Sequence, residues 1–147
     1  MISSFRDEYF FLSNFYPVDI KIDGIVYPNA ETAFQAQKTL DVEERRKFSM
    51  LKNPVQAKRL GRKVKLRDDW EEVKLDIMTE IVSQKFLQHP YLIEMLLQTD
   101  DEELVEGNKW GDRFWGVCKG KGENHLGKIL MKIRDAYKSI GGNYDVD

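Results

Sequence analysis

The 147 residues suit one domain, and 23 Lys and Arg against 25 Asp and Glu leave a formal net charge of −2. That balance excludes a globally basic nucleic-acid-binding protein and a strongly acidic disordered tail. The single cysteine, Cys118, excludes an internal disulfide, and with only His89 and His125 beside it the chain is too poor in ligands for a structural zinc site. We therefore expect chemistry based on carboxylates, Lys, Arg or aromatic side chains, with no metal and no cofactor.

The sequence shows no signal for export or membrane insertion. Residues 1–8 lack a basic region followed by an apolar run, and no apolar stretch approaches the roughly 20 residues needed to span a bilayer. There is no internal repeat, low-complexity tract or Ser- or Gly-rich linker. We expect a cytoplasmic protein that does not bind membranes, with residues 1–147 forming one domain. The sequence does not determine the oligomeric state.

Extended segments come first in chain order. Residues 9–12 are predicted to form a short aromatic strand, and residues 13–17 a loop. Residues 18–22 and 25–27 alternate apolar and polar side chains, which predicts two further strands. Asp23-Gly24 between them is a strong signal for a two-residue hairpin turn, because both positions tolerate positive φ.

Helix signals occupy the middle of the chain. Asn29 can cap one helix, Asp41 and Glu44 resemble a capping box for a second, and Asn53 followed by proline begins a third that Gly61 can end. The predicted helices cover residues 30–40, 42–51 and 54–61.

The longest helix is predicted to begin at Asp68 or Asp69 and to run to about His89, with a short helix after Pro90. Apolar residues recur at helical spacing along both and predict core-facing stripes. The stripe of the long helix comprises Trp70, Val73, Ile77, Met78 and Ile81, and that of the short helix Leu92, Ile93, Leu96 and Leu97.

The last part of the chain mixes extended and helical signals. Residues 103–106 and 114–117 are candidate strands, and residues 116–127 form a Gly-rich loop. Asn124 is predicted to cap a final helix that ends at Gly141-Gly142. With strands at the two ends and helices between them, the order predicts an α+β fold, mostly helical, with a small antiparallel sheet or hairpin.

The first candidate for chemistry is the helix after Pro28. Glu31, Gln35 and Lys38 lie at i, i+4 and i+7 and share one helix face, with Glu31 in the first turn, where the helix dipole favours a carboxylate. A solvated polar face is the alternative interpretation of the same spacing.

A second candidate is the basic stretch, residues 58–67, which holds six Lys and Arg. Arg62 could hold phosphate through planar bidentate contacts, and the stretch could also be a nucleic-acid footprint. The alternative is a solvated helix and turn whose charge is balanced by the acids at 68–72.

Two further motifs lie near the end of the chain. Trp110 and Trp115 flank Asp112, so the tryptophans could stack on a base or sugar while Asp112 acts as a general base or charge stabiliser. Equally, both tryptophans could be core residues beside a turn aspartate. Residues 122–128 fit GxxxxGK, but Ile129 stands where a phosphate loop needs Ser or Thr, which excludes a P-loop NTPase. The helix start at Asn124 could still attract an anion.

Taken in order, these blocks resemble the NADAR family of YbiA-like proteins from about residue 10 to residue 134. The blocks are FLSNF at 11–15, YPNAE at 27–31 with Gln35 and Lys38, AKRLGR at 57–62, DRFWG at 112–116 and GENHLGKILMKIR at 122–134. The resemblance implies an N-glycosidase that hydrolyses the ribose C1–N bond of a phosphoribosylated or ADP-ribosylated substrate. Riboflavin-pathway phosphoribosylaminopyrimidines and ADP-ribose on a modified base such as guanine are the implied substrates.

That chemistry builds positive charge on the sugar ring, which a carboxylate stabilises. The resemblance makes Glu31 the first choice and Asp112 the second, with Lys38 holding a substrate oxygen or tuning the acid. The residues implied in substrate binding are Ser13, Asn14, Phe15, Gln35, Arg62, Trp110, Trp115, Asn124 and Gly127. Among them, Arg62 and the Asn124–Gly127 helix start would bind phosphate.

The partner is expected to be a small-molecule phosphoribosyl or ADP-ribosyl substrate, with ADP-ribosylated nucleic acid as a second class. Two other functions stay open at this point. A non-catalytic ADP-ribose or nucleotide-binding module could use the same residues, and a nucleic-acid-binding domain could use the basic stretch.

Overall fold

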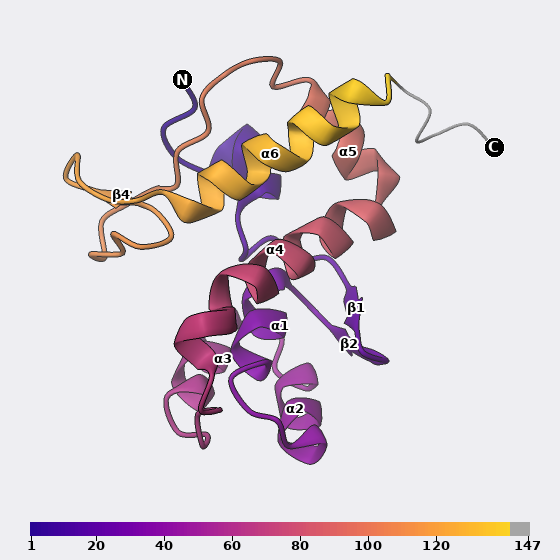
Figure 1. Ribbon diagram of the computed structural model, residues 1–147, viewed down its shortest axis with the longest axis vertical. Helices are drawn as coiled ribbons and strands as arrows, with labels where there is room; N and C mark the ends of the chain where they lie inside the picture. The colour runs from indigo at the N-terminus through magenta and orange to yellow at the C-terminus, as the bar shows by residue number, and fades with distance from the viewer. Residues whose placement is uncertain (142–147) are drawn as a thin grey trace. The chain divides into compact units, whose positions relative to one another are not determined.

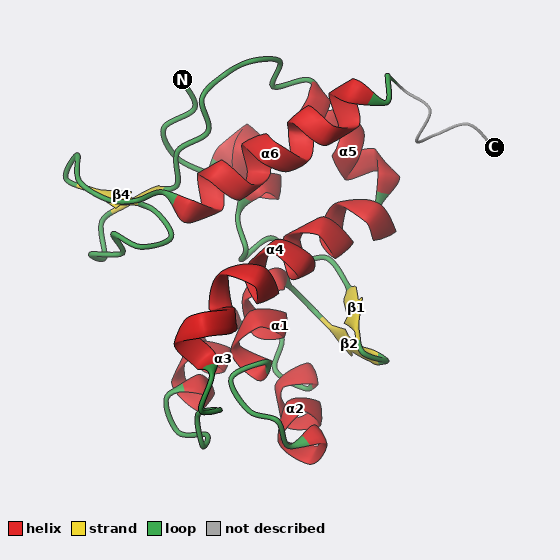
Figure 2. Ribbon diagram, in the orientation of Figure 1, coloured by secondary structure: helices red, strands yellow, loops and turns green. Residues whose placement is uncertain are grey.

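A computed structural model describes residues 1–141, which divide into two compact units (Figure 1). The central unit comprises Asn14–Gln88, and the terminal unit comprises residues 1–13 together with the chain from residue 89 onward. Helices dominate, and the described strands form two short pairs (Figure 2), so the predicted α+β class is confirmed. A single domain over residues 1–147 stays a prediction.

The central unit begins with the predicted hairpin. Strands β1 (Ile20–Ile22) and β2 (Ile25–Tyr27) pair antiparallel, with Ile20 opposite Tyr27. The turn residues Asp23 and Gly24 have φ of 50° and 82°, in the left-handed region that these residue types tolerate. The end residues of both strands are buried and the middle ones exposed, so the hairpin presents one apolar face to the unit.

The three predicted caps are confirmed. Helix α1 (Ala30–Ala36) begins where Asn29 accepts a 2.7 Å hydrogen bond from the Thr32 amide. Asp41 accepts from two amides at the start of α2 (Val42–Ser49), and Asn53 accepts from one at the start of α3 (Pro54–Gly61). These side chains satisfy amides that have no partner inside their own helices.

Helix α1 ends at Ala36, four residues before the predicted end. The carbonyl of Lys38 accepts a 2.8 Å hydrogen bond from the Arg67 amide, and the carbonyl of Thr39 accepts from Arg45 Nε at 2.9 Å. Both carbonyls are therefore bound to distant groups, and the chain leaves the helix to reach them. Propensity alone could not reveal this, because both partners lie elsewhere in the sequence.

Helix α4 (Trp70–Gln88) contacts α1 and β1. Trp70, Met78 and Ile81 are buried as predicted, whereas Val73 and Ile77 are only half-buried. The buried face continues instead through Val82, Lys85 and Phe86. None of the helices within residues 1–141 is long and apolar enough to cross a membrane.

The start of the terminal unit corrects one prediction. Residues 9–12 do not form a strand but belong to η1, a 3₁₀ helix over Asp7–Leu12. Its turns close through hydrogen bonds from the amides of Tyr9 and Ser13 to carbonyls three residues earlier. Phe11 and Leu12 are both buried although they are adjacent, which the alternation of a half-buried strand does not allow.

The candidate strands at 103–106 and 114–117 are also wrong in extent. The observed parallel pair is β3 (Gly107–Asn108) with β4 (Val117–Cys118), and Leu104 forms only an isolated bridge with Ile2. In this region, hydrogen bonds between side chains and the backbone take the place of most of the backbone–backbone hydrogen bonds that longer strands would make.

The helices of the terminal unit agree better with the predictions. The short helix after Pro90 is α5 (Pro90–Leu97), and the last is α6 (His125–Ser139), which contacts α5. Gly141, with φ of 61°, follows the end of α6 as predicted, and Gly142 lies outside the described residues.

Lys85 is the unexpected member of the α4 core, because its side chain is only 1% exposed. Its ammonium lies 5.6 Å from the ring centroids of both Tyr16 and Phe86. Burial lowers the pKa of Lys85 to about 7, because the charged form loses its hydration. In the unfolded chain a lysine titrates near its ordinary value, so folding opposes the charged form of Lys85.

We predict that the free energy of unfolding of the wild type rises relative to Lys85→Met between about pH 7 and pH 10. Over that window the unfolded chain keeps the Lys85 proton and the folded chain has lost it, so higher pH favours folding. The full change is on the order of 5 kcal/mol. Urea unfolding of both proteins across this range measures it; a stability difference that does not change with pH would contradict the assignment.

Candidate active site

Glu31 lies in the first turn of α1 and is buried, with 9% of the residue exposed. Its Oε2 accepts a 2.7 Å hydrogen bond from Nε2 of Gln35, one turn later and itself buried. The solvated-face alternative is therefore wrong for both residues. A carboxylate this deep is stabilised by the hydrogen bond and by the amino-terminal end of the helix.

The loop before β1 is attached to the same turn. The Glu31 amide donates a 2.9 Å hydrogen bond to the Asn14 carbonyl, which fixes residue 14 beside the start of α1. The Asn14 side chain is buried and places its Nδ2 3.4 Å from Met78 Sδ. Within residues 1–141 its Oδ1 has no hydrogen-bond partner, so this acceptor is available to a ligand donor.

Gly61 allows α3 to approach the Gln35 amide closely. A Cβ at position 61 would lie 2.0 Å from Gln35 Oε1 and 3.0 Å from its Cδ. Only glycine therefore leaves room for the rotamer in which Gln35 bonds to Glu31. Gly61 was predicted as a helix terminator, and its steric role toward Gln35 was missed because nothing in the sequence shows that α3 packs on α1.

Lys38 lies near this carboxylate, and two further cations, Lys58 and Arg62, lie near Lys38. Lys38 follows α1 directly, and burial lowers the pKa of its ammonium; the nearby charges of Arg62 and Lys58 act in the same direction, whereas Glu31 opposes them. Lys58 was not predicted individually, although it lies in the basic stretch. Such a group of like charges is costly by itself and is stabilised by an anion.

Aromatic rings lie beneath two of these cations. Lys58 Nζ is 5.6 Å from the ring centroid of Phe15, and Lys38 Nζ is 6.0 Å from that of Trp70. Both distances suit cation–π attraction. The rest of the basic stretch differs, because Arg67 is bound by Asp69 through two hydrogen bonds, so the balanced-charge alternative holds for that residue.

The structure thus brings together six of the predicted site residues in the central unit. They are Asn14, Phe15, Glu31, Gln35, Lys38 and Arg62, joined by the unpredicted Lys58 and Trp70. The other six belong to the terminal unit: Ser13, Trp110, Asp112, Trp115, Asn124 and Gly127.

In the terminal unit, Asp112 organises a turn. Its Oδ1 accepts hydrogen bonds from the amides of Phe114 and Trp115 at 3.1 and 2.9 Å, and its own backbone is bound by the Asn108 side chain. This geometry favours the turn interpretation. Trp110 is 64% exposed, so the alternative that it is a core residue is wrong, and its ring is accessible.

Trp115 is half-buried and packs edge-on against Phe114, with the rings 4.8 Å apart. Its ring also lies 6.3 Å from that of His125 at the start of α6. Ser13, also half-buried, follows the end of η1, and its amide completes the last turn. Trp115 is therefore part of an aromatic cluster rather than of a deep core.

The prediction that the Asn124 side chain caps α6 is wrong. Asn124 has φ of 54°, and its side chain bonds instead to the Leu104 carbonyl and the Glu106 amide, both at 2.9 Å. A Cβ on Gly127 would lie 2.1 Å from that same Leu104 carbonyl, so the glycine permits close packing. The amides of His125 and Leu126 donate to carbonyls of the preceding loop, which removes two donors that an anion would need.

Comparison with known proteins agrees with the family resemblance. The NADAR domain profile matches residues 3–138. The chain belongs to the NADAR family. N-glycosidase YbiA of Escherichia coli (strain K12) is 41% identical over 135 residues, which cover 90% of this chain and 84% of that protein. The NMR structure of E. coli YbiA superposes with a TM-score of 0.83 and 37% identity, covering 99% of this chain and 89% of the other.

A second relative is larger. The riboflavin biosynthesis protein VVA0006 of Vibrio vulnificus (strain YJ016) is 41% identical over 128 residues, which cover 85% of this chain but only 35% of that protein. The chain thus spans about a third of this relative and most of YbiA. These names agree with the expectation of a glycosidase hydrolase.

We predict that Gly61→Ala disrupts the bond between Gln35 and Glu31, because the new methyl group would lie only 2.0 Å from Gln35 Oε1 and push that side chain away. The expected cost is about 1 kcal/mol in the free energy of unfolding. The same substitution in a Gln35→Ala background should cost much less, because the clash is gone. Urea unfolding of the four proteins measures this coupling, and additive effects would refute it.

Proposed function

We propose that this protein is an N-glycosidase that hydrolyses the ribose C1–N bond of a phosphoribosylated small molecule. The observation that carries the proposal is the buried Glu31 carboxylate, oriented by Gln35 and close to Lys38, which in turn lies near Lys58 and Arg62. The family and the names of its relatives support the same reaction class. The riboflavin biosynthesis relative favours a phosphoribosylaminopyrimidine as substrate over an ADP-ribosyl conjugate.

Glu31 is proposed to stabilise the transition state. As the C1–N bond breaks, positive charge develops on the ribose ring, and a carboxylate held out of water attracts it strongly. The same group can take the proton of the water that attacks C1. Gln35 fixes the orientation of the carboxylate through its hydrogen bond to Oε2.

The cations are proposed to bind the substrate phosphate. A phosphate dianion would offset the repulsion among Lys38, Lys58 and Arg62, and Arg62 is exposed and can offer planar paired donors. The acceptor oxygen of Asn14 and the ring of Phe15 suit a donor-rich heterocycle carried by the leaving group.

The remaining predicted residues have a secondary place in the proposal. Asp112 is kept as a second candidate for the carboxylate role, and Trp110, Trp115 and Ser13 as candidate contacts to base or sugar. Asn124 and Gly127 are assigned to packing rather than to phosphate binding, because the loop before α6 uses the donors there.

We expect Glu31→Gln to lower turnover about 10²–10⁴-fold while substrate binding is retained, because the amide keeps the shape and loses the charge. The wild type and the variant are incubated with phosphoribosylaminopyrimidine intermediates and ADP-ribosylated guanine in EDTA, and mass spectrometry detects the released sugar. Asp112→Asn, which keeps the turn acceptor, is the matched control and should lose less activity. No product from any wild-type incubation would refute the function, and near-normal turnover by Glu31→Gln would remove Glu31 from the mechanism.

Lys38 makes phosphate binding sensitive to alkaline pH. Its lowered pKa means that the ammonium deprotonates at a lower pH than an ordinary lysine, so affinity should fall as pH rises, before the pH at which an ordinary lysine loses its charge, about 10.4, is reached. In Lys38→Arg the guanidinium stays charged, and the affinity should be flatter over this range. Calorimetric titration with ribose 5-phosphate at several pH values tests this, and identical profiles for the two proteins would exclude Lys38 from the phosphate site.

A further inference from the structure

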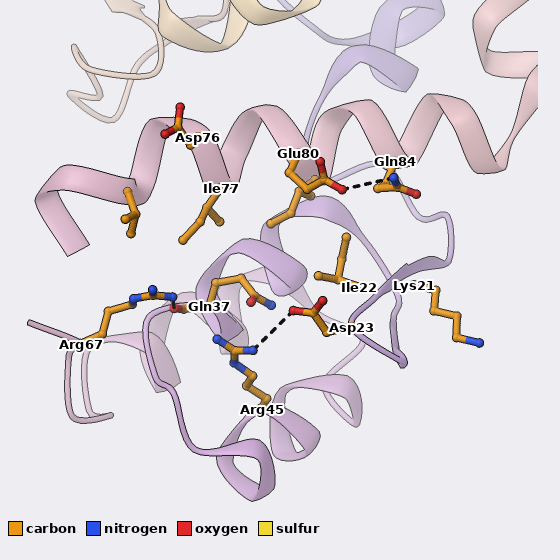
Figure 3. A pocket seen from close by; sticks show the side chains of 12 residues that line it. Lys21, Ile22, Asp23, Gln37, Arg45, Arg67, Asp76, Ile77, Glu80 and Gln84 are labelled. Carbon is orange, nitrogen blue, oxygen red and sulfur yellow. Dashed lines mark hydrogen bonds and ion pairs between the residues drawn. The ribbon is translucent and has the colours of Figure 1, made fainter. Parts of the chain in front are cut away.

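A pocket in the central unit is lined by none of the residues assigned to catalysis. It has a volume of about 590 Å³ and is lined by α4, the hairpin, α2 and the segment that follows α1 (Figure 3). This volume is in the range that holds small organic ligands. Glu31, Lys38, Lys58 and Arg62 do not line the pocket.

One side of the pocket is apolar. Ile22 from β1 and Ile81 from α4 are buried, and Val73 and Ile77 are the half-buried residues that departed from the predicted core stripe. Figure 3 shows Ile77 pointing from α4 toward the side on which Gln37 and Arg67 lie. A ligand that covered these side chains would remove apolar surface from water that the folded chain leaves partly exposed, which favours binding.

Arg45 supplies the polar group. Its side chain is only 13% exposed, and within the described residues it makes one hydrogen bond, from Nε to the Thr39 carbonyl, and one long ion pair of 3.8 Å with Asp23. Figure 3 shows its guanidinium rising from α2 toward Asp23. Both terminal nitrogens therefore keep donors without short hydrogen bonds to the protein. A carboxylate accepts two such donors in parallel.

The other charged groups of the pocket limit the ligand. The guanidinium of Arg67 is already bound by Asp69 and the Gln37 carbonyl, so it offers less to a ligand than Arg45 does. Asp23, Asp76 and Glu80 also line the pocket, and their negative charges, offset in part by Lys21, oppose a ligand with more than one negative charge. A monoanion is thus favoured over a phosphate dianion.

We propose that this pocket is a binding site for a small organic monoanion, with a carboxylate on Arg45 and an apolar body on Ile22, Ile77 and Ile81. The site is separate from the proposed N-glycosidase site, and its occupation requires no reaction. A ligand here would contact α4, the hairpin and α2 at once.

The test uses 3-phenylpropionate as the probe, with 3-phenylpropanol as its uncharged counterpart. Titration is followed through the methyl signals of isoleucine-labelled protein by NMR. We expect saturable shifts at Ile22, Ile77 and Ile81, and binding at least about tenfold weaker for the alcohol. Equal affinity for the two probes, or shifts confined to other isoleucines, would overturn the proposal.

Two variants locate the site. Arg45→Gln should weaken 3-phenylpropionate binding at least about tenfold, whereas Arg46→Gln, which removes a neighbouring exposed guanidinium from the same helix, should not change it. If Arg45→Gln does not fold, Ile77→Trp fills the pocket from the half-buried side and should abolish the shifts at Ile22 and Ile81. Unchanged probe binding in Ile77→Trp would refute the pocket as the binding site.

Discussion

The central unit depends on a constraint set by α1, in which every residue from Ala30 to Ala36 is buried. A helix with no solvent face must satisfy its polar side chains inside the protein. The hydrogen bond between Gln35 and Glu31 meets part of this requirement, whereas Gln35 Oε1 and Thr32 Oγ1 have no hydrogen-bond partner within residues 1–141. The bond needs glycine at position 61, because any larger residue would displace Gln35. Core packing and the geometry of the carboxylate therefore depend on the same contact.

Local chemistry made much of the fold predictable. The Asp23-Gly24 turn and the caps at Asn29, Asp41 and Asn53 act over two to four residues, so the sequence alone was sufficient to place them. Features set by distant partners were not predictable in this way. The early end of α1 depends on Arg67, and the short strands of the terminal unit depend on side chains that bond to backbone far along the chain.

The candidate site likewise combines features that local sequence determines with features that depend on distant residues. The shared face of Glu31, Gln35 and Lys38 follows from helical spacing, but spacing could not show that the face is buried, and burial is what distinguishes a site from a solvated surface. Arg62 and Lys58 could be found only as members of a basic stretch, because their approach to α1 depends on how α3 packs. The cap predicted at Asn124 was wrong because asparagine is a common cap residue. In the structure its side-chain amide instead bonds to the backbone of the segment before β3 and so links that segment to the start of α6.

The attachment of residue 14 to the first turn of α1 affects how far the dipoles around the Glu31 carboxylate can reorient. The Glu31 amide bonds to the Asn14 carbonyl, and the Gln35 side chain bonds to the Glu31 carboxylate. The dipoles around the carboxylate are therefore set when the chain folds. In water, by contrast, solvent molecules must turn each time a charge appears. In the proposed reaction, a carboxylate fixed in this way would meet the developing cation with its surroundings already oriented, so the energy of reorientation would be supplied by folding and would not be part of the barrier.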